Sequence, residues 1–231
     1  YQDFFIYPEN LLDAVSNDKV VFEVTRWSEG DKNPEAKVVQ ILGKTGENEA
    51  EIHSIMAEFD LPFRFPENVL SESEAISESI PEAEIRKRKD FRNVLTFTID
   101  PHDAKDFDDA LSIQKLANGN WEIGVHIADV SHYLKPGSMI DVEGYSRATS
   151  VYLVDRVVPM LPEALSADLC SLREAEDRAT LAVRMVFDAN GNKRRHEFIR
   201  GVMRSAARLT YRQAQDAFDG RHDAKTAALQ E

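Results

Sequence analysis

Stretches in which apolar and polar residues alternate, or in which β-branched and aromatic residues cluster, predict β-strands along this chain. The strand candidates are 4–7, 18–27, 36–42, 94–99, 110–113, 121–127, 181–187 and 195–203. Asn190-Gly191 lies between the last two runs and predicts a hairpin, and Asn118-Gly119-Asn120 links the runs at 110–113 and 121–127.

Other segments predict helices. The helix candidates are 50–59, 81–89, 137–148 and 210–218. Residues 61–66 suggest an irregular break, and the Glu- and Ser-rich segment 67–78 suggests a solvated connector. Strands and helices of this kind place the chain in a mixed α+β fold class.

Length and composition narrow the class of protein. A chain of 231 residues can bury a sizeable core in one large or two small domains. No run approaches the roughly 18–20 apolar residues that span a bilayer, and no signal-peptide pattern follows Tyr1. We expect the single cysteine, Cys170, to be a small buried hydrophobe, and we expect a reducing, cytoplasmic setting with no membrane partner.

Five aspartates lie within ten residues, between two of the predicted strands. They are Asp100, Asp103, Asp106, Asp108 and Asp109. Carboxylates this close repel one another unless a hard cation neutralises them, and Mg²⁺ takes oxygen ligands while leaving positions for substrate phosphates. An acidic surface loop is the alternative, whereas an EF-hand is excluded because neither register supplies its glycine and glutamate.

The net charge of −13 is unevenly distributed. Residues 1–90 carry 20 acidic and 10 basic side chains, whereas 178–212 carry nine basic and two acidic ones. A basic segment beside an acidic centre suits a polyanionic strand that ends at a metal site, although it could also balance the acidic first part of the chain. Arg200, Arg204, Arg208 and Arg212 recur every four residues and would share one face if the stretch were helical.

The acidic motif belongs to an ordered series of blocks that resembles the catalytic (RNB) domain of the ribonuclease II/R family. The blocks are IDPHDAKDFDDA (99–110), GVHIADVSHY (124–133), TSVYL (149–153), VPMLP (158–162), LCSL (169–172) and ARLTY (207–211). The block that contains His126 is most similar to the bacterial ribonuclease R branch. Ala148 departs from the pattern, because the family usually has glycine there, and Glu174-Ala175 replace a common proline.

The resemblance implies a magnesium-dependent 3′-to-5′ exoribonuclease that hydrolyses single-stranded RNA to nucleoside 5′-monophosphates. It implies that Asp100 and Asp109 hold Mg²⁺ most directly, with Asp106 in support, and that loss of Asp108 harms cleavage most. Asp106 and Asp108 are thus the catalytic acids, and all four carboxylates form the metal set. Asp103 lies outside this set, as a solvated or capping residue.

The resemblance also implies an RNA-binding role for Tyr152, as an aromatic clamp that stacks on the base at the 3′ end. Arg204 and Arg208 complete the predicted RNA-binding set. We expect His126 to be structural, and we discount a zinc site and a nucleophilic serine because the spacing each requires is missing.

We divide the chain into three parts on this basis. Residues 1–46 resemble part of a cold-shock or OB-type β-barrel, 47–90 form a helical, acidic connector, and 91–231 form the first portion of the RNB domain. Phe4, Phe5, Tyr7 and Trp27 could stack on bases, although core packing is the preferred role for Trp27.

The family's catalytic domain continues beyond the ARLTY block and supplies a catalytic arginine there. The resemblance therefore implies that this chain is a fragment of a larger enzyme, and that the fragment by itself can lack RNA-cleaving activity. Two rival functions stay open: an RNA-binding module with structural acids, and a metal-dependent phosphotransferase or polymerase. No DNA partner is expected, and the sequence does not indicate an oligomeric state.

Overall fold

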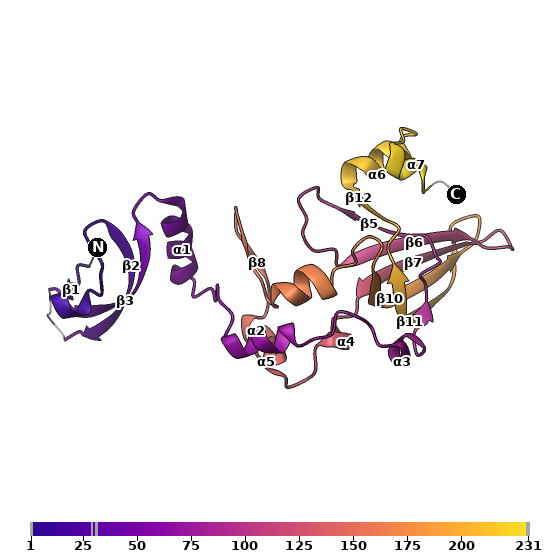
Figure 1. The fold of residues 1–231 in the computed structure, drawn as a ribbon. Coiled ribbons are helices and arrows are strands. Elements are labelled where there is room, and N and C mark those ends of the chain that lie inside the picture. The colour runs from indigo at the N-terminus through magenta and orange to yellow at the C-terminus, as the bar shows by residue number, and fades with distance from the viewer. Residues whose placement is uncertain (1, 29, 31, 230–231) are drawn as a thin grey trace. The chain divides into compact units, whose positions relative to one another are not determined.

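A computed structural model describes residues 2–28, 30 and 32–229, which form two compact units, Tyr1–Arg64 and Phe65–Glu231 (Figure 1). Residues 47–64 thus belong to the first unit, whereas the sequence pattern predicted a connector that begins at residue 47. The three-part division at residues 46 and 90 stays a proposal.

The first unit is a small sheet with one helix. Its strands β1 (Phe5–Ile6), β2 (Asp18–Arg26) and β3 (Glu35–Lys44) lie in the order β1-β3-β2, with β1 parallel and β2 antiparallel to β3. A short 3₁₀ helix, η1 (Pro8–Asn10), follows β1, and helix α1 (Asn48–Glu58) follows β3. Ala36 and Val38 of β3 and Ala50 and Met56 of α1 are buried, so α1 covers one part of this sheet.

Trp27 is not a core residue, contrary to the preferred interpretation of the sequence. It follows the last residue of β2 and is 63% exposed, with an edge-to-face contact to Phe4 at 6.0 Å between ring centroids. A sheet of three strands in the described residues offers too little apolar surface to cover an indole at its end.

The second unit is built around a seven-stranded mixed sheet in the order β12-β5-β6-β7-β10-β11-β4 (Figure 1). Its strands are β4 (Lys89–Asp90), β5 (Thr96–Asp100), β6 (Asp109–Lys115), β7 (Trp121–Ala128), β10 (Asp177–Phe187), β11 (Lys193–Arg204) and β12 (Ala207–Thr210). The pairs β5–β6, β6–β7, β7–β10 and β10–β11 are antiparallel, and Asp188 to Asn192 close the predicted hairpin between β10 and β11. The two outer strands pair in parallel, β12 with β5 and β4 with β11.

Helices and a separate hairpin complete this unit. The elements are α2 (Glu67–Glu74), α3 (Glu82–Ile85), α4 (Val130–Tyr133), α5 (Met139–Arg147), the π-helix η2 (Ala164–Leu169), α6 (Tyr211–Phe218), α7 (Ala224–Ala227) and the strands β8 (Val151–Tyr152) and β9 (Val157–Val158). Helices α5 and α6 confirm two of the predicted helices, whereas the predicted helix over 81–89 is reduced to the single turn of α3. Among the described residues, no helix is long and apolar enough to cross a bilayer.

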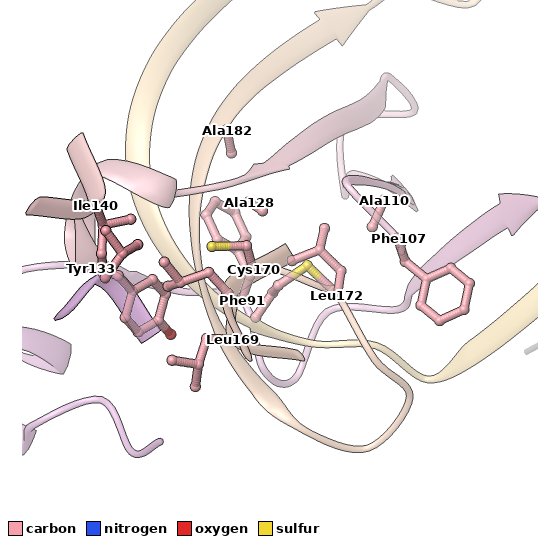
Figure 2. Packing of buried hydrophobic residues seen from close by; sticks show 13 residues of the cluster. Phe91, Phe107, Ala110, Ala128, Tyr133, Ile140, Leu169, Cys170, Leu172 and Ala182 are labelled. Atoms are coloured by element: carbon pink, nitrogen blue, oxygen red, sulfur yellow. The ribbon is translucent and has the colours of Figure 1, made fainter. Parts of the chain in front are cut away.

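The main core of the second unit lies on one face of the sheet. Figure 2 shows Phe107 and Ala110 at one end of this cluster, Tyr133 and Ile140 at the other, and Cys170 between them. Cys170 is 3% exposed, which confirms its predicted role as a buried hydrophobe. Strand residues alternate between the two faces of a sheet, so every second side chain lies on the face opposite the core. Several apolar side chains on that face are exposed. They include Ile113, Ile127, Leu181 and Phe198.

The structure overturns one further expectation from the sequence. Residues 67–74 form helix α2 and not a solvated connector, since Val69 is buried in the core and Glu72 accepts a hydrogen bond from the Ile140 amide at 3.0 Å. The condition under which the four-residue arginine repeat would share one helical face is not met, and β11 instead confirms the strand predicted over 195–203. Arg200 and Arg204 belong to β11 and Arg208 to β12, where strand pairing prevails over the helical spacing.

Candidate active site

The aspartate-rich segment is the loop that joins two neighbouring strands of the large sheet. Asp100 is the last residue of β5, and Asp109 is the first residue of β6. Their strands are hydrogen-bonded to each other, so the two ends of the loop start from fixed positions in one sheet. Asp106 and Asp108 lie within the loop, two residues apart.

Phe107 anchors the loop between those two aspartates. Its side chain is buried in the main core, its amide donates to the Ser171 hydroxyl at 3.1 Å, and its carbonyl accepts from the Leu172 amide at 2.7 Å. Because Phe107 is held on both its side chain and its backbone, the flanking Asp106 and Asp108 are directed to the surface beside it.

Strand β7 fixes the other side of the acidic motif. The amide of Ala128 donates to the carbonyl of Asp108 at 2.9 Å, and Asp109 pairs with Ile127 in the sheet register. The HIAD block of the sequence therefore supports the backbone that carries two of the predicted metal ligands.

The carboxylates influence one another electrostatically. Burial raises the pKa of Asp100, and the charges of Asp109 and Asp106 raise it further, whereas the nearby Thr98 hydroxyl and the charge of Arg208 act in the opposite direction. Loss of solvation also raises the pKa of Asp108, followed by the charges of Asp106, Asp109 and Asp100. Such mutual destabilisation of ionised carboxylates is what a divalent cation relieves.

A buried oxygen at this site lacks a protein partner. Oδ2 of Asp100 is buried and, within the described part of the chain, accepts no hydrogen bond. An orphaned carboxylate oxygen among other acids fits a hard cation such as Mg²⁺. The described residues nevertheless contain no group of three or more His, Cys, Asp or Glu side chains in a ready metal-binding arrangement. Asp103, which the sequence left outside the predicted metal set, is exposed and contacts His102.

Tyr152 reaches the acidic loop from the β8–β9 hairpin. Its hydroxyl donates to Oδ2 of Asp106 at 3.4 Å, while the residue is 68% exposed. Burial, followed by the charge of Asp106, raises the pKa of this phenol. The structure thus brings an exposed aromatic ring to the edge of the carboxylate group.

The two arginines predicted to bind RNA differ in their surroundings. Nε of Arg204 donates to Asp177 at 2.7 Å, and half of its side-chain surface is exposed. Arg208 is half-buried, and its guanidinium donates to backbone carbonyls of the acidic loop.

The profile of the RNB domain family matches residues 88–231, and that of the CSD2 cold shock domain matches residues 1–66. The chain belongs to the RNB family. This result and the α+β structure confirm the predicted resemblance and the predicted fold class, a partial cold-shock or OB-like domain followed by an RNB domain.

Two curated relatives of the RNB chain are named ribonuclease R. The chain is 46% identical to ribonuclease R of Thermotoga maritima over 211 residues, which cover 90% of this chain and 30% of the relative. It is 45% identical to ribonuclease R of Aquifex aeolicus over 84% of this chain and 28% of the relative. The structure of Mycoplasma genitalium RNase R in complex with double-stranded RNA superposes with a TM-score of 0.88 at 27% identity, over 98% of this chain and 41% of that one. The RNB chain therefore spans less than half the length of these proteins.

His126 of the RNB chain has the structural role that its apolar strand predicted. It is fully buried, it shares a hydrogen bond with the Ser112 hydroxyl at 2.9 Å, and its ring meets Phe91 edge to face. Burial lowers its pKa to about 4, so the ring is neutral at physiological pH.

Sequence reasoning missed a buried ion pair behind the site. Nη1 of Arg88 lies 2.8 Å from Oδ2 of Asp129, and both side chains are less than 5% exposed. Asp129 directly follows Ala128, whose amide holds Asp108, so the pair borders the acidic motif. The available signal was the position of Asp129 at the end of an apolar strand, where an acid requires a partner.

Proposed function

We propose that this RNB chain carries the acidic centre of an exoribonuclease that hydrolyses single-stranded RNA from the 3′ end and releases nucleoside 5′-monophosphates. The observation that carries the proposal is the placement of four aspartates on one short connection: Asp100 ends β5, Asp109 begins the adjacent β6, and Asp106 and Asp108 lie in the loop between them, with a buried Asp100 oxygen that accepts no hydrogen bond. Relatives named ribonuclease R, one of them solved with ribose-methylated single-stranded RNA, support the choice of substrate.

The four carboxylates have distinct proposed roles. Asp100 and Asp109 hold Mg²⁺, Asp106 supports them, and Asp108 is the acid whose removal harms hydrolysis most. When bound, Mg²⁺ acidifies water and neutralises charge that builds on the phosphate oxygens. The loop supports this assignment because Phe107 and Ala128 fix the backbone on both sides of Asp108.

Tyr152 and Arg204 are the proposed contacts for RNA. The exposed ring of Tyr152 offers a stacking surface, and stacking on an aromatic ring holds any base, which suits degradation without sequence preference. Arg204 offers a partly exposed cation to the phosphate backbone. We also propose a cytoplasmic location, which is consistent with the buried, unpaired thiol of Cys170.

The test is hydrolysis of a 5′-labelled single-stranded RNA by the protein expressed from its complete reading frame. We expect shortening from the 3′ end and release of nucleoside 5′-monophosphates in Mg²⁺, and no release in EDTA. Asp108→Asn should abolish release while RNA binding survives, and Asp103→Asn is the matched control from the same loop. Equal release by wild type and Asp108→Asn would refute the assignment of Asp108. RNA binding without Mg²⁺-dependent release by the wild type would favour an RNA-binding module.

A further inference from the structure

One arginine outside the acidic motif holds the backbone of the acidic loop. Nη2 of Arg208, on strand β12, lies 3.3 Å from the carbonyl oxygen of Pro101, 2.7 Å from that of His102 and 3.3 Å from that of Ala104. The loop therefore curls around a cation, and three of its carbonyl dipoles point inward at one nitrogen.

The same guanidinium also contacts the anchor of the loop. Cζ of Arg208 lies 4.7 Å from the ring centroid of Phe107, which is a cation–π geometry, and the Nε atom is buried. One side chain thus bridges the start of the loop at 101–104 and Phe107 near its end. Of the predicted metal ligands, Asp106 lies between these two points, and Asp100, Asp108 and Asp109 directly flank them.

The backbone of Arg208 is itself fixed by neighbouring residues. Its amide donates to Oε2 of Glu174 at 3.1 Å, its carbonyl accepts from Nζ of Lys225 at 3.0 Å, and β12 pairs in parallel with β5. Glu174 and Lys225 are also ion-paired at 2.6 Å. The cation is therefore presented to the loop from a fixed strand.

We propose that Arg208 is a positioning residue, which shapes the acidic loop and thereby the metal-binding carboxylates, and is not a contact for RNA phosphate. This inference rests on the proposed function for its catalytic consequence, although its structural part does not. A lysine point charge keeps the positive charge but cannot reproduce the several directed hydrogen bonds and the ring stacking of a planar guanidinium.

The decisive comparison is among three arginine variants of the protein from its complete reading frame. Arg208→Gln removes the proposed organiser, Arg204→Gln removes a proposed RNA contact, and Arg212→Gln removes an equal charge from a side chain that is 92% exposed. Arg208→Lys is the conservative variant, which keeps the charge and loses the planar fork. Urea unfolding of each variant establishes that it is folded.

For Arg208→Gln we expect kcat to fall about 10–100-fold, as for residues that orient metal ligands, with a higher Mg²⁺ requirement. The slope of log RNA affinity against log salt should stay at its wild-type value, whereas loss of one phosphate contact lowers it by about 0.7. Arg208→Lys should recover only part of kcat. Arg204→Gln should change the salt slope and KM with little effect on kcat, and Arg212→Gln should match the wild type.

Hydrogen exchange provides a readout that does not need activity. The Ala104 amide, which donates to the Pro101 carbonyl at 3.1 Å, should exchange about tenfold faster in Arg208→Gln than in Arg212→Gln. Unchanged exchange at Ala104, or a salt slope that falls as in Arg204→Gln, would overturn the positioning role. Faster exchange in a protein that shows no RNA hydrolysis with any variant would support the positioning role and refute the proposed function instead.

Discussion

Replacement of Arg88 by methionine should reveal how strongly the large sheet depends on one buried ion pair. The Arg88 side chain is 1% exposed and that of Asp129 is 4% exposed. Arg88 also donates to the carbonyls of Thr180 and Gly201, on β10 and β11, at 3.4 Å each. The substitution would leave the Asp129 carboxylate buried, with the Ser131 hydroxyl at 2.6 Å as its nearest remaining side-chain donor.

The expected cost follows from the burial of both partners. Removal of one member of a buried ion pair destabilises a protein by about 3–5 kcal/mol, because the other charge stays desolvated. The matched control is Arg86→Met, two residues earlier, where arginine and Glu82 form an exposed pair with side chains 76% and 67% exposed. Such an exposed pair in helical spacing contributes about 0.3–0.5 kcal/mol.

Urea unfolding at two pH values is the assay. Burial favours a higher pKa for Asp129, but the hydrogen bonds from Ser131 and Arg88 and the charges of Arg88 and Arg200 outweigh it, so the pKa lies below its usual value of 3.8. Without Arg88, burial should raise that pKa. The penalty should then be full at pH 7 and should shrink as acid protonates Asp129, since a neutral carboxyl costs less to bury.

Two results would refute this reasoning. A loss below about 1 kcal/mol for Arg88→Met at pH 7 would place the pair in the range of surface salt bridges. An equal loss at pH 7 and in acid would mean that the uncompensated charge of Asp129 is not the cause. The double variant Arg88→Met/Asp129→Asn should recover part of the loss, because it leaves no charge buried.

Three further predictions concern single residues. The folded-state pKa of Asp108 is raised, so its ionised form destabilises the metal-free protein at neutral pH. Asp108→Asn should therefore raise the Tm in EDTA at pH 7, and this gain in Tm should disappear as the pH falls toward the ordinary pKa of 3.8. The pKa of His126 is lowered from 6.5 to about 4, so the free energy of unfolding should fall as the pH drops from 6.5 to 4. Urea unfolding near pH 7 and about pH 5 should show a smaller fall for His126→Gln than for the wild type, and identical profiles would contradict this. Ala148 ends α5 at a φ of 64°, so Ala148→Gly should stabilise the protein by about 1 kcal/mol in thermal unfolding, and a lower Tm would count against strain there.

The sequence was most informative where residue type alone specifies structure or chemistry. Asn190-Gly191 predicted a hairpin correctly, because few dipeptides accept the positive φ that Gly191 adopts. The aspartates between two strands predicted the loop between β5 and β6, because neighbouring strands bring the ends of their connection together. The order of motif blocks predicted the RNB family.

The sequence was least informative where long-range packing decides the structure. Glu67 to Glu74 reads as solvated, but Val69 reaches a core made by residues far along the chain. The role of Arg208 depends on the parallel pairing of β12 with β5, which no local pattern reveals.

The parallel pairing of β12 with β5 has a consequence for synthesis on the ribosome. The outer edge of β5 stays unpaired until β12 has been synthesised, because residue 97 pairs with residue 207, more than one hundred residues later. At about 5–20 residues per second, the nascent acidic loop spends on the order of ten seconds without its arginine. We therefore expect protease to cut stalled nascent chains that end before β12 within 101–108, and we expect longer chains to resist. The acidic centre would then be completed only after β12 has been synthesised.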